Sequence, residues 1–328
     1  MLLRFYRNSH PSSFFTIPFI ALLCWIPFLF FRPESFIMEV PRPMPVYEWL
    51  YAGISRLNIY VQYFISWLLI SVQAIYLNQL IVKHELFPRL SFLPALIFVT
   101  LSVLFPEMMR IQPSLFVNLV LLMVLDKVFL LYKNPEPLGK TFDASFLLAF
   151  ATLIDSSAVA FYIYLLLSLV VLLPFYWRVW IISLIGFALP FYFLSVYLFL
   201  TDSLSDFWQK IPQAFSVIRF MPPTLNASQV ISLSVLLLLV TLAIFSISSH
   251  FYRNIIRIRR YFHLLFLFLV FAALSTLLTP AISLRSLCIL LIPLAIFLSY
   301  FFLQLKKKAF AEFSFLLLVV FIILVRFS

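Results

Sequence analysis

The sequence is poor in glycine, cysteine and charge. It holds 3 glycines and 2 cysteines among 328 residues, and 11% of its residues are charged. Soluble domains carry roughly 25% charged residues, so this composition and a mean hydropathy of +1.11 exclude a soluble globular protein. Cys24 and Cys288 both lie inside apolar runs, which argues against a disulfide framework or a thiolate metal site.

Motifs for nucleotide or zinc binding are also absent, since the chain has no P-loop, dinucleotide-binding, HExxH or CxxC pattern. Its glycines are isolated near expected helix ends or loops, and no internal repeat is evident. Secondary transporters usually break their spans with Gly or Pro and are built from repeats, so this class is disfavoured. It is not eliminated, because three prolines in apolar runs could kink helices: Pro94, Pro190 and Pro293.

Long apolar runs dominate the chain instead. Backbone amides in lipid must be satisfied internally, so such runs predict helices, and the alternation of a membrane barrel is absent. We expect an all-α polytopic protein of about eleven transmembrane helices, with residues 1–328 as one transmembrane domain. The third and fifth runs are shorter than the ~20 residues of a full span, so they either extend into loops or form a shielded re-entrant hairpin. The runs are 14–31, 58–82, 92–105, 114–131, 144–154, 158–175, 181–200, 229–249, 264–278, 286–303 and 313–325.

The basic residues predict an orientation. A formal net charge of +11 could indicate nucleic-acid binding, but the Lys and Arg residues are spread over many short loops, so we expect no nucleic-acid partner. The positive-inside rule places the N-terminus inside and the C-terminus outside. This assigns to the cytoplasm Arg4, Arg7, Lys83, Arg89, Lys127, Lys133, Lys140, Arg178, Arg253, Arg257, Arg259, Arg260, Lys306, Lys307 and Lys308.

Two longer loops fall on the outer side, at residues 32–57 and 201–228. The segment FRPESFIMEVPRPMPVYEWL carries four prolines and three glutamates, and its prolines break it into pieces too short to span, so short interfacial helices are expected. The second loop alternates aromatic and charged residues, as amphipathic segments in the headgroup region do. A simple connector is the alternative interpretation.

Candidate chemistry on the outer side depends on carboxylates and arginines, because all four histidines map to the cytoplasmic side. Arginine suits a lipid phosphate, and a carboxylate suits activation of an acceptor hydroxyl. Asp155 is prominent, since it stands between two short apolar segments where charge is costly without water or a partner. On the cytoplasmic side, Asp126 and Lys127 are interpreted as snorkelling or ion-paired charges, and the basic run HFYRNIIRIRRYFH as a contact with anionic lipid.

Three stretches carry a resemblance to a known group of proteins. LPALIFVTLSVLFPEMMRIQPSLFVNLVLLMVL, TFDASFLLAFATLID and LPFYWRVWIISLIGFALPFYFLSVYLFLTD resemble an uncharacterised family of polytopic inner-membrane proteins from the Bacteroidota. More distantly, the order of parts is similar to the C-type membrane glycosyltransferases (GT-C), which use polyprenyl-phosphate-linked sugars. Those enzymes have one helix, a long outer loop with an acidic catalytic residue, and then many helices.

The resemblance implies a bacterial inner-membrane protein that acts on or binds polyprenyl-phosphate-linked sugars. Glu34 or Glu39 would be the catalytic carboxylate, and the lipid phosphate would meet arginines from Arg42, Arg56 and Arg285. A divalent metal is compatible with this chemistry, but the sequence identifies no ligands for it. The chain departs from the family in lacking paired acidic residues in the first outer loop. The alternatives are therefore a degenerate subunit or scaffold in a complex with other membrane subunits, or a lipid or solute transporter.

Overall fold

The computed structural model describes residues 6–7, 13–30, 37, 44–174, 176–215, 226–250, 255–278, 284, 286–305 and 308–327. Within these residues the chain is helical, and the strand-like pairing is one isolated parallel bridge between Ile37 and Ile111. The predicted all-α class is therefore confirmed for the described part of the chain.

Eight helices form the first half of the described chain. Five of them have proline in their first turn, where its fixed φ fits and its missing N–H is no loss. Pro94 thus begins a helix rather than kinking one, whereas Pro190 does lie inside a helix. The elements are α2 (Ser13–Phe30), α3 (Pro45–Ile54), α4 (Ile59–Lys83), α5 (Leu93–Ser102), α6 (Pro106–Met109), α7 (Pro113–Phe129), α8 (Pro137–Ile154) and the 3₁₀ helix η1 (Ser156–Val159).

Eight further helices form the second half of the described chain. They are α9 (Ala160–Leu172), α10 (Trp177–Leu200), α11 (Leu204–Phe215), α12 (Ala227–His250), α13 (Ile256–Leu277), the 3₁₀ helix η3 (Ser286–Leu290), α14 (Leu291–Gln304) and α15 (Lys308–Phe327). Helix α10 packs against α8 of the first half, α9 packs against α13, and α12 packs against α14 and α15. Helix α11 is strongly amphipathic and falls in the expected loop 201–228.

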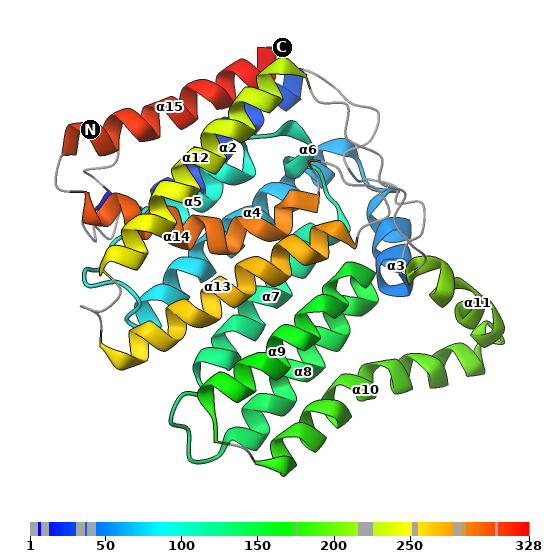
Figure 1. Cartoon of the computed structure of the whole chain (residues 1–328). Coiled ribbons are helices and arrows are strands. Elements are labelled where there is room, and N and C mark those ends of the chain that lie inside the picture. The colour runs from blue at the N-terminus through cyan, green and yellow to red at the C-terminus, as the bar shows by residue number, and fades with distance from the viewer. Residues whose placement is uncertain are drawn as a thin grey trace.

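The long helices run back and forth between two ends of one bundle (Figure 1). The C-terminal ends of α4, α7, α9, α12 and α14 lie together with the N-terminal ends of α5, α8, α10, α13 and α15. We call this the basic end, because most described Lys and Arg residues occur there, in and beside these helix ends. The opposite end, which we call the loop end, carries α3, α6 and α11.

Six helical segments are long and apolar enough to cross a membrane. They are Ile59–Lys83, Pro137–Ile154, Trp177–Leu200, Ala227–Ser249, Ile256–Leu277 and Ser286–Gln304. Large apolar side chains on α10 face outward, including Tyr192, Phe199 and Leu200, as expected for contact with lipid. The protein therefore has the character of a multi-spanning helical membrane protein.

The two short runs behave differently. All ten residues of α5 are buried, and the helix packs between α4 and α14, so its neighbours shield it. The fifth run belongs to a longer helix, because α8 begins at Pro137, seven residues before the apolar run at 144. In this added segment Asp143 forms an ion pair with Lys127 of α7, and Lys127 Nζ lies 2.6 Å from Asp143 Oδ2. The ion pair allows polar residues to extend the helix.

Large side chains fill most helix contacts, as the scarcity of glycine leads one to expect. Phe161 and Tyr164 on α9 meet Phe268 on α13, with ring centroids 4.9 and 5.3 Å apart. Gly186 is the exception. A Cβ there would overlap the Ser145 hydroxyl of α8 and stand 3.0 Å from the Phe142 carbonyl oxygen, so α8 and α10 approach closely at this point.

We predict that Gly186→Ala lowers the free energy of unfolding by about 1–3 kcal/mol, the usual cost of overpacking a tight contact. Thermal unfolding in detergent measures the effect. Ser145→Ala alone should change little, because its hydroxyl bonds only carbonyls of its own helix, Thr141 at 2.9 Å and Phe142 at 3.0 Å.

The double variant Gly186→Ala with Ser145→Ala should recover part of the loss, since the overlapping oxygen is gone. Recovery should be incomplete, because the Phe142 carbonyl still stands close to the new methyl group. A Gly186→Ala protein as stable as the parent would contradict the close approach of α8 and α10.

Candidate functional site

Asp155 lies at the loop end, at the junction of α8 and η1. Its backbone N–H closes α8 by bonding the Ala151 carbonyl at 2.9 Å, and its carboxylate accepts from the Ser157 N–H at 3.0 Å. The side chain therefore ends one helix and caps the next, which fits the preference of Asp for such positions. Burial raises the pKa of Asp155, while the hydrogen bond from Ser157 opposes this shift.

Helix α3 packs against the end of α8 beside Asp155 (Figure 1). Tyr47 is the buried residue of α3, with no exposed surface, and Met44 before the helix packs with Leu153 of α8 and Leu198 of α10. Burial raises the pKa of Tyr47, and the nearby Tyr51 and Asp155 raise it further. The segment 44–54 is thus fixed to the helix that carries Asp155.

This arrangement provides a carboxyl group and a phenol in one partly buried place. The Tyr47 hydroxyl is protonated at neutral pH, as an ordinary phenol is, and its raised pKa keeps it so at higher pH; it can therefore donate a hydrogen bond. A carboxylate whose pKa is raised is a better proton acceptor than an exposed one, which suits a general base toward a hydroxyl group. We call Asp155, Tyr47 and Tyr51 the loop-end site.

The other predicted site residues are not brought into this site by the described structure. Arg56 is exposed in the turn after α3, and among the described residues Asp155 forms no ion pair with it. Glu34, Glu39, Arg42 and Arg285 lie outside the described residues. Their roles stay predictions.

A divalent metal has no evident ligand set here. No group of three or more His, Cys, Asp or Glu side chains suited to a metal exists among the described residues. The residues of the loop-end site therefore do not fit a metal centre, and we derive no step through one.

At the basic end, Asp126 of α7 is bound by two neighbouring residues at the end of α4. Its Oδ2 lies 2.8 Å from Lys83 Nζ and its Oδ1 lies 2.7 Å from His84 Nε2. The interpretation of Asp126 as ion-paired is confirmed, but its partners were not foreseen, and the adjacent Lys127 pairs elsewhere. The adjacent Lys83 and His84 at the end of the predicted helix 58–82 were the sequence feature that could have indicated these partners.

Aromatic rings pack against the His84 side of this cluster. His84 meets the rings of Phe129 and Tyr261 edge to face, at 5.2 and 5.9 Å, and the Tyr261 hydroxyl donates to the Phe129 carbonyl at 3.1 Å. The His84 side chain keeps only 5% of its surface exposed. The cluster joins α4, α7 and α13 at one point and accounts for its charges internally, so we assign it a structural role.

Buried amides form a second polar cluster in the interior. Asn118 of α7 donates to the Cys288 carbonyl at 2.7 Å, and Gln73 of α4 donates to the Leu115 carbonyl at 2.8 Å. Both amides donate to backbone carbonyl oxygens, one of them within η3 and the other within α7. Asn118 thus ties α7 to η3, and Gln73 ties α4 to α7; sequence patterns gave no sign of either contact.

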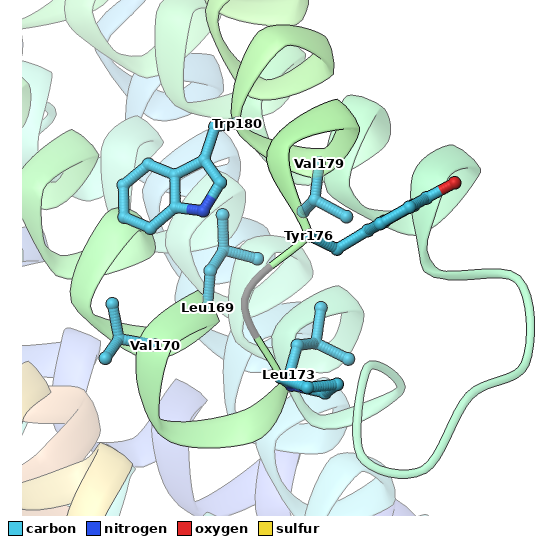
Figure 2. A pocket seen from close by; sticks show the side chains of 7 residues that line it. Leu169, Val170, Leu173, Tyr176, Val179 and Trp180 are labelled. Atoms are coloured by element: carbon cyan, nitrogen blue, oxygen red, sulfur yellow. The ribbon is translucent and has the colours of Figure 1, made fainter.

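A small apolar hollow lies where α9 gives way to α10, at the basic end. Leu169, Val170, Leu173, Val179 and Trp180 surround it, and Tyr176 lies at its side (Figure 2). Its volume of about 70 Å³ is too small for a drug-sized ligand, which takes roughly 300 Å³ or more. Beside it, the Arg178 guanidinium lies 5.8 Å from the rings of Tyr176 and Trp177.

Comparison with known proteins adds no assignment: no family model, curated protein or solved structure matches the chain. Function is therefore argued from the chain's own residues.

We predict that the Asp126 cluster matters more for stability than the nearby Lys127–Asp143 pair. Asp126→Ala leaves the buried His84 without its partner, so the free energy of unfolding should fall by about 1–3 kcal/mol. Asp143→Ala removes a pair whose side chains are 29% and 42% exposed, so it should cost less than about 1 kcal/mol. Equal losses of thermal stability in the two variants would refute the ranking.

Proposed function

We propose that this protein is a multi-spanning protein of a bacterial inner membrane that acts on or binds a polyprenyl-phosphate-linked sugar at its loop end. The observation that carries the proposal is the loop-end site: Asp155 caps η1 at the end of α8, this helix packs against α3 with its buried Tyr47, and burial raises the pKa of Asp155. Sugar transfer needs a group that takes the proton of an acceptor hydroxyl, and Asp155 has the proton affinity for that task. The resemblance to GT-C enzymes implies a catalytic carboxylate at the outer face, and the proposal assigns this role to Asp155.

The orientation is part of this proposal. The basic end faces the cytoplasm, because Lys and Arg residues next to membrane spans are retained on that side. The loop end then faces the periplasm, where α3 and α11 lie near the lipid headgroups. Trp49 of α3 stacks edge to face on Tyr197 of α10 at 5.5 Å, and aromatic residues of this kind favour the interface.

In the proposed reaction, Asp155 accepts the proton of the acceptor hydroxyl as that oxygen attacks the sugar carbon bound to phosphate. The bond between the sugar carbon and the phosphate oxygen breaks, and the polyprenyl phosphate leaves with the electron pair. Arginine at the loop end would hold the phosphate, and Arg56 is the described candidate. In this proposal, other membrane subunits dock on segment 32–57, which carries both signs of charge, and help to form the site that binds the lipid-linked sugar.

The test uses full-length protein in nanodiscs, purified in mild detergent with any subunits it retains, and a labelled polyprenyl-phosphate sugar. We expect Asp155→Asn to abolish transfer, because the amide cannot accept the proton, while the labelled lipid still binds. Asp202→Asn is the matched control. Asp202 is an exposed carboxylate at the same end with φ 54°, a conformation that Asn tolerates, so transfer should be unchanged.

Loss of fold does not explain the expected result. The pKa of Asp155 is higher in the folded than in the unfolded protein. The free energy of unfolding therefore falls as pH rises above the unfolded pKa of this group, and the charge of Asp155 opposes folding at neutral pH. Asn removes that charge and keeps an oxygen for the Ser157 N–H. Asp155→Asn should therefore unfold at a temperature no lower than the parent at pH 7.

Two results would count against the proposal. A parent protein that neither binds nor transfers the labelled sugar would refute it. Full transfer by Asp155→Asn would exclude Asp155 as the base, and the variants Glu34→Gln and Glu39→Gln would then test the first loop; intact transfer in all three would indicate a scaffold.

A further inference from the structure

A hollow of about 430 Å³ lies at the basic end between the α4–α5 connection and the start of α13. Its size falls within the range of small-molecule sites. Glu85, with φ 52°, turns the chain out of α4 and brings Pro88, Arg89 and Leu90 around to face Arg257 of α13. The hollow does not share residues with the loop-end site and has no part in the proposed reaction.

Positive charge predominates around this hollow. Arg89 and Arg257 line it, and the one acidic residue in its lining, Glu85, forms an ion pair with Arg257. Arg7 stands close enough to Arg89 that their repulsion helps burial lower the pKa of Arg7, while Glu312 opposes this. An anion in the hollow would relieve the repulsion and share Arg257 with Glu85.

A buried serine also lines the hollow. Ser91 lines it and is only 4% exposed, and its Oγ forms no hydrogen bond in the described part of the chain. A buried hydroxyl without a partner is costly, so an acceptor oxygen that reached Ser91 Oγ would be stabilised by it. A phosphate oxygen would accept from Ser91 as well as from the guanidinium groups.

The remaining walls are apolar and continue along two helices. Ile81 and Val82 of α4 and Ile258 of α13 line the hollow, and both helices are candidate membrane spans. Leu90 and Ile255 at its rim are 60% and 71% exposed. A ligand that fits must therefore combine an anionic head with an apolar tail lying along α4 and α13.

We propose that this hollow binds the phosphate headgroup of an anionic membrane phospholipid, with Arg89, Arg257 and Ser91 around the phosphate. The lipid tail would lie against the exposed apolar faces of α4 and α13. Arg257 would leave or share its pair with Glu85 when the lipid binds.

Native mass spectrometry of the full chain tests this proposal after reconstitution in nanodiscs of phosphatidylethanolamine with or without phosphatidylglycerol. We expect the parent to retain phosphatidylglycerol in preference to phosphatidylethanolamine. Arg257→Gln and Arg89→Gln should each weaken retention about fivefold. Ser91→Ala should weaken it less, and Glu85→Gln should strengthen it, because Arg257 is freed from its pair.

Arg178→Gln is the matched control, since it removes the same charge from an exposed site at the same end, outside the hollow. It should leave retention unchanged. An equal loss in Arg178→Gln and Arg257→Gln would show a diffuse charge effect and overturn the site. Equal retention of both lipids by the parent would overturn it as well.

Inorganic phosphate distinguishes a lipid from a free anion. Phosphate added at millimolar concentration should not displace phosphatidylglycerol from the parent, because it lacks the apolar tail. Complete displacement, or binding of phosphate alone with the same dependence on Arg257 and Glu85, would assign the hollow to a soluble anion and overturn the lipid proposal. The Glu85→Gln variant also distinguishes an anion-binding site of either kind from a purely structural role of the Glu85–Arg257 ion pair. Loss of a purely structural ion pair would not strengthen binding.

Discussion

The cost of an unpaired polar group away from water is the constraint on which this structure depends. It forces the backbone into helices, and it decides where side-chain oxygens and nitrogens can lie. In the interior, Gln73 and Asn118 bond carbonyl oxygens of other helices, and Ser66 bonds the Met109 carbonyl where α6 ends. Charges sit at the two ends of the bundle, where water or an opposite charge can satisfy them.

The two ends satisfy their charges in different ways, and this difference separates their roles. At the basic end Asp126 and Asp143 each have a close cationic partner, so these carboxylates are held in the structure. At the loop end Asp155 accepts a hydrogen bond from the Ser157 N–H, and no cation among the described residues pairs with it. A carboxylate held without a counter-ion keeps its affinity for a proton, which is the property that acid–base chemistry uses.

Sequence patterns predicted the all-α class and some individual helices well, and the contacts between helices poorly. The runs at 58–82 and 181–200 correspond closely to α4 and α10, because apolar length is a local property. The start of α8 was missed, since Asp143 is polar and becomes acceptable only when Lys127 of another helix reaches it. Likewise, Asp155 was recognised as a costly charge, but its neighbour Tyr47 lies more than a hundred residues earlier in the chain, and only tertiary packing joins them.

The central claim is that the bundle crosses a membrane with its basic end in the cytoplasm. Labelling of single cysteines with a membrane-impermeant maleimide tests it most directly, at Arg56→Cys on the loop end and Lys133→Cys on the basic end, both exposed positions. The account predicts that residue 56 reacts in intact cells and that residue 133 reacts only after permeabilisation. Reaction of both residues from the same side would contradict the account.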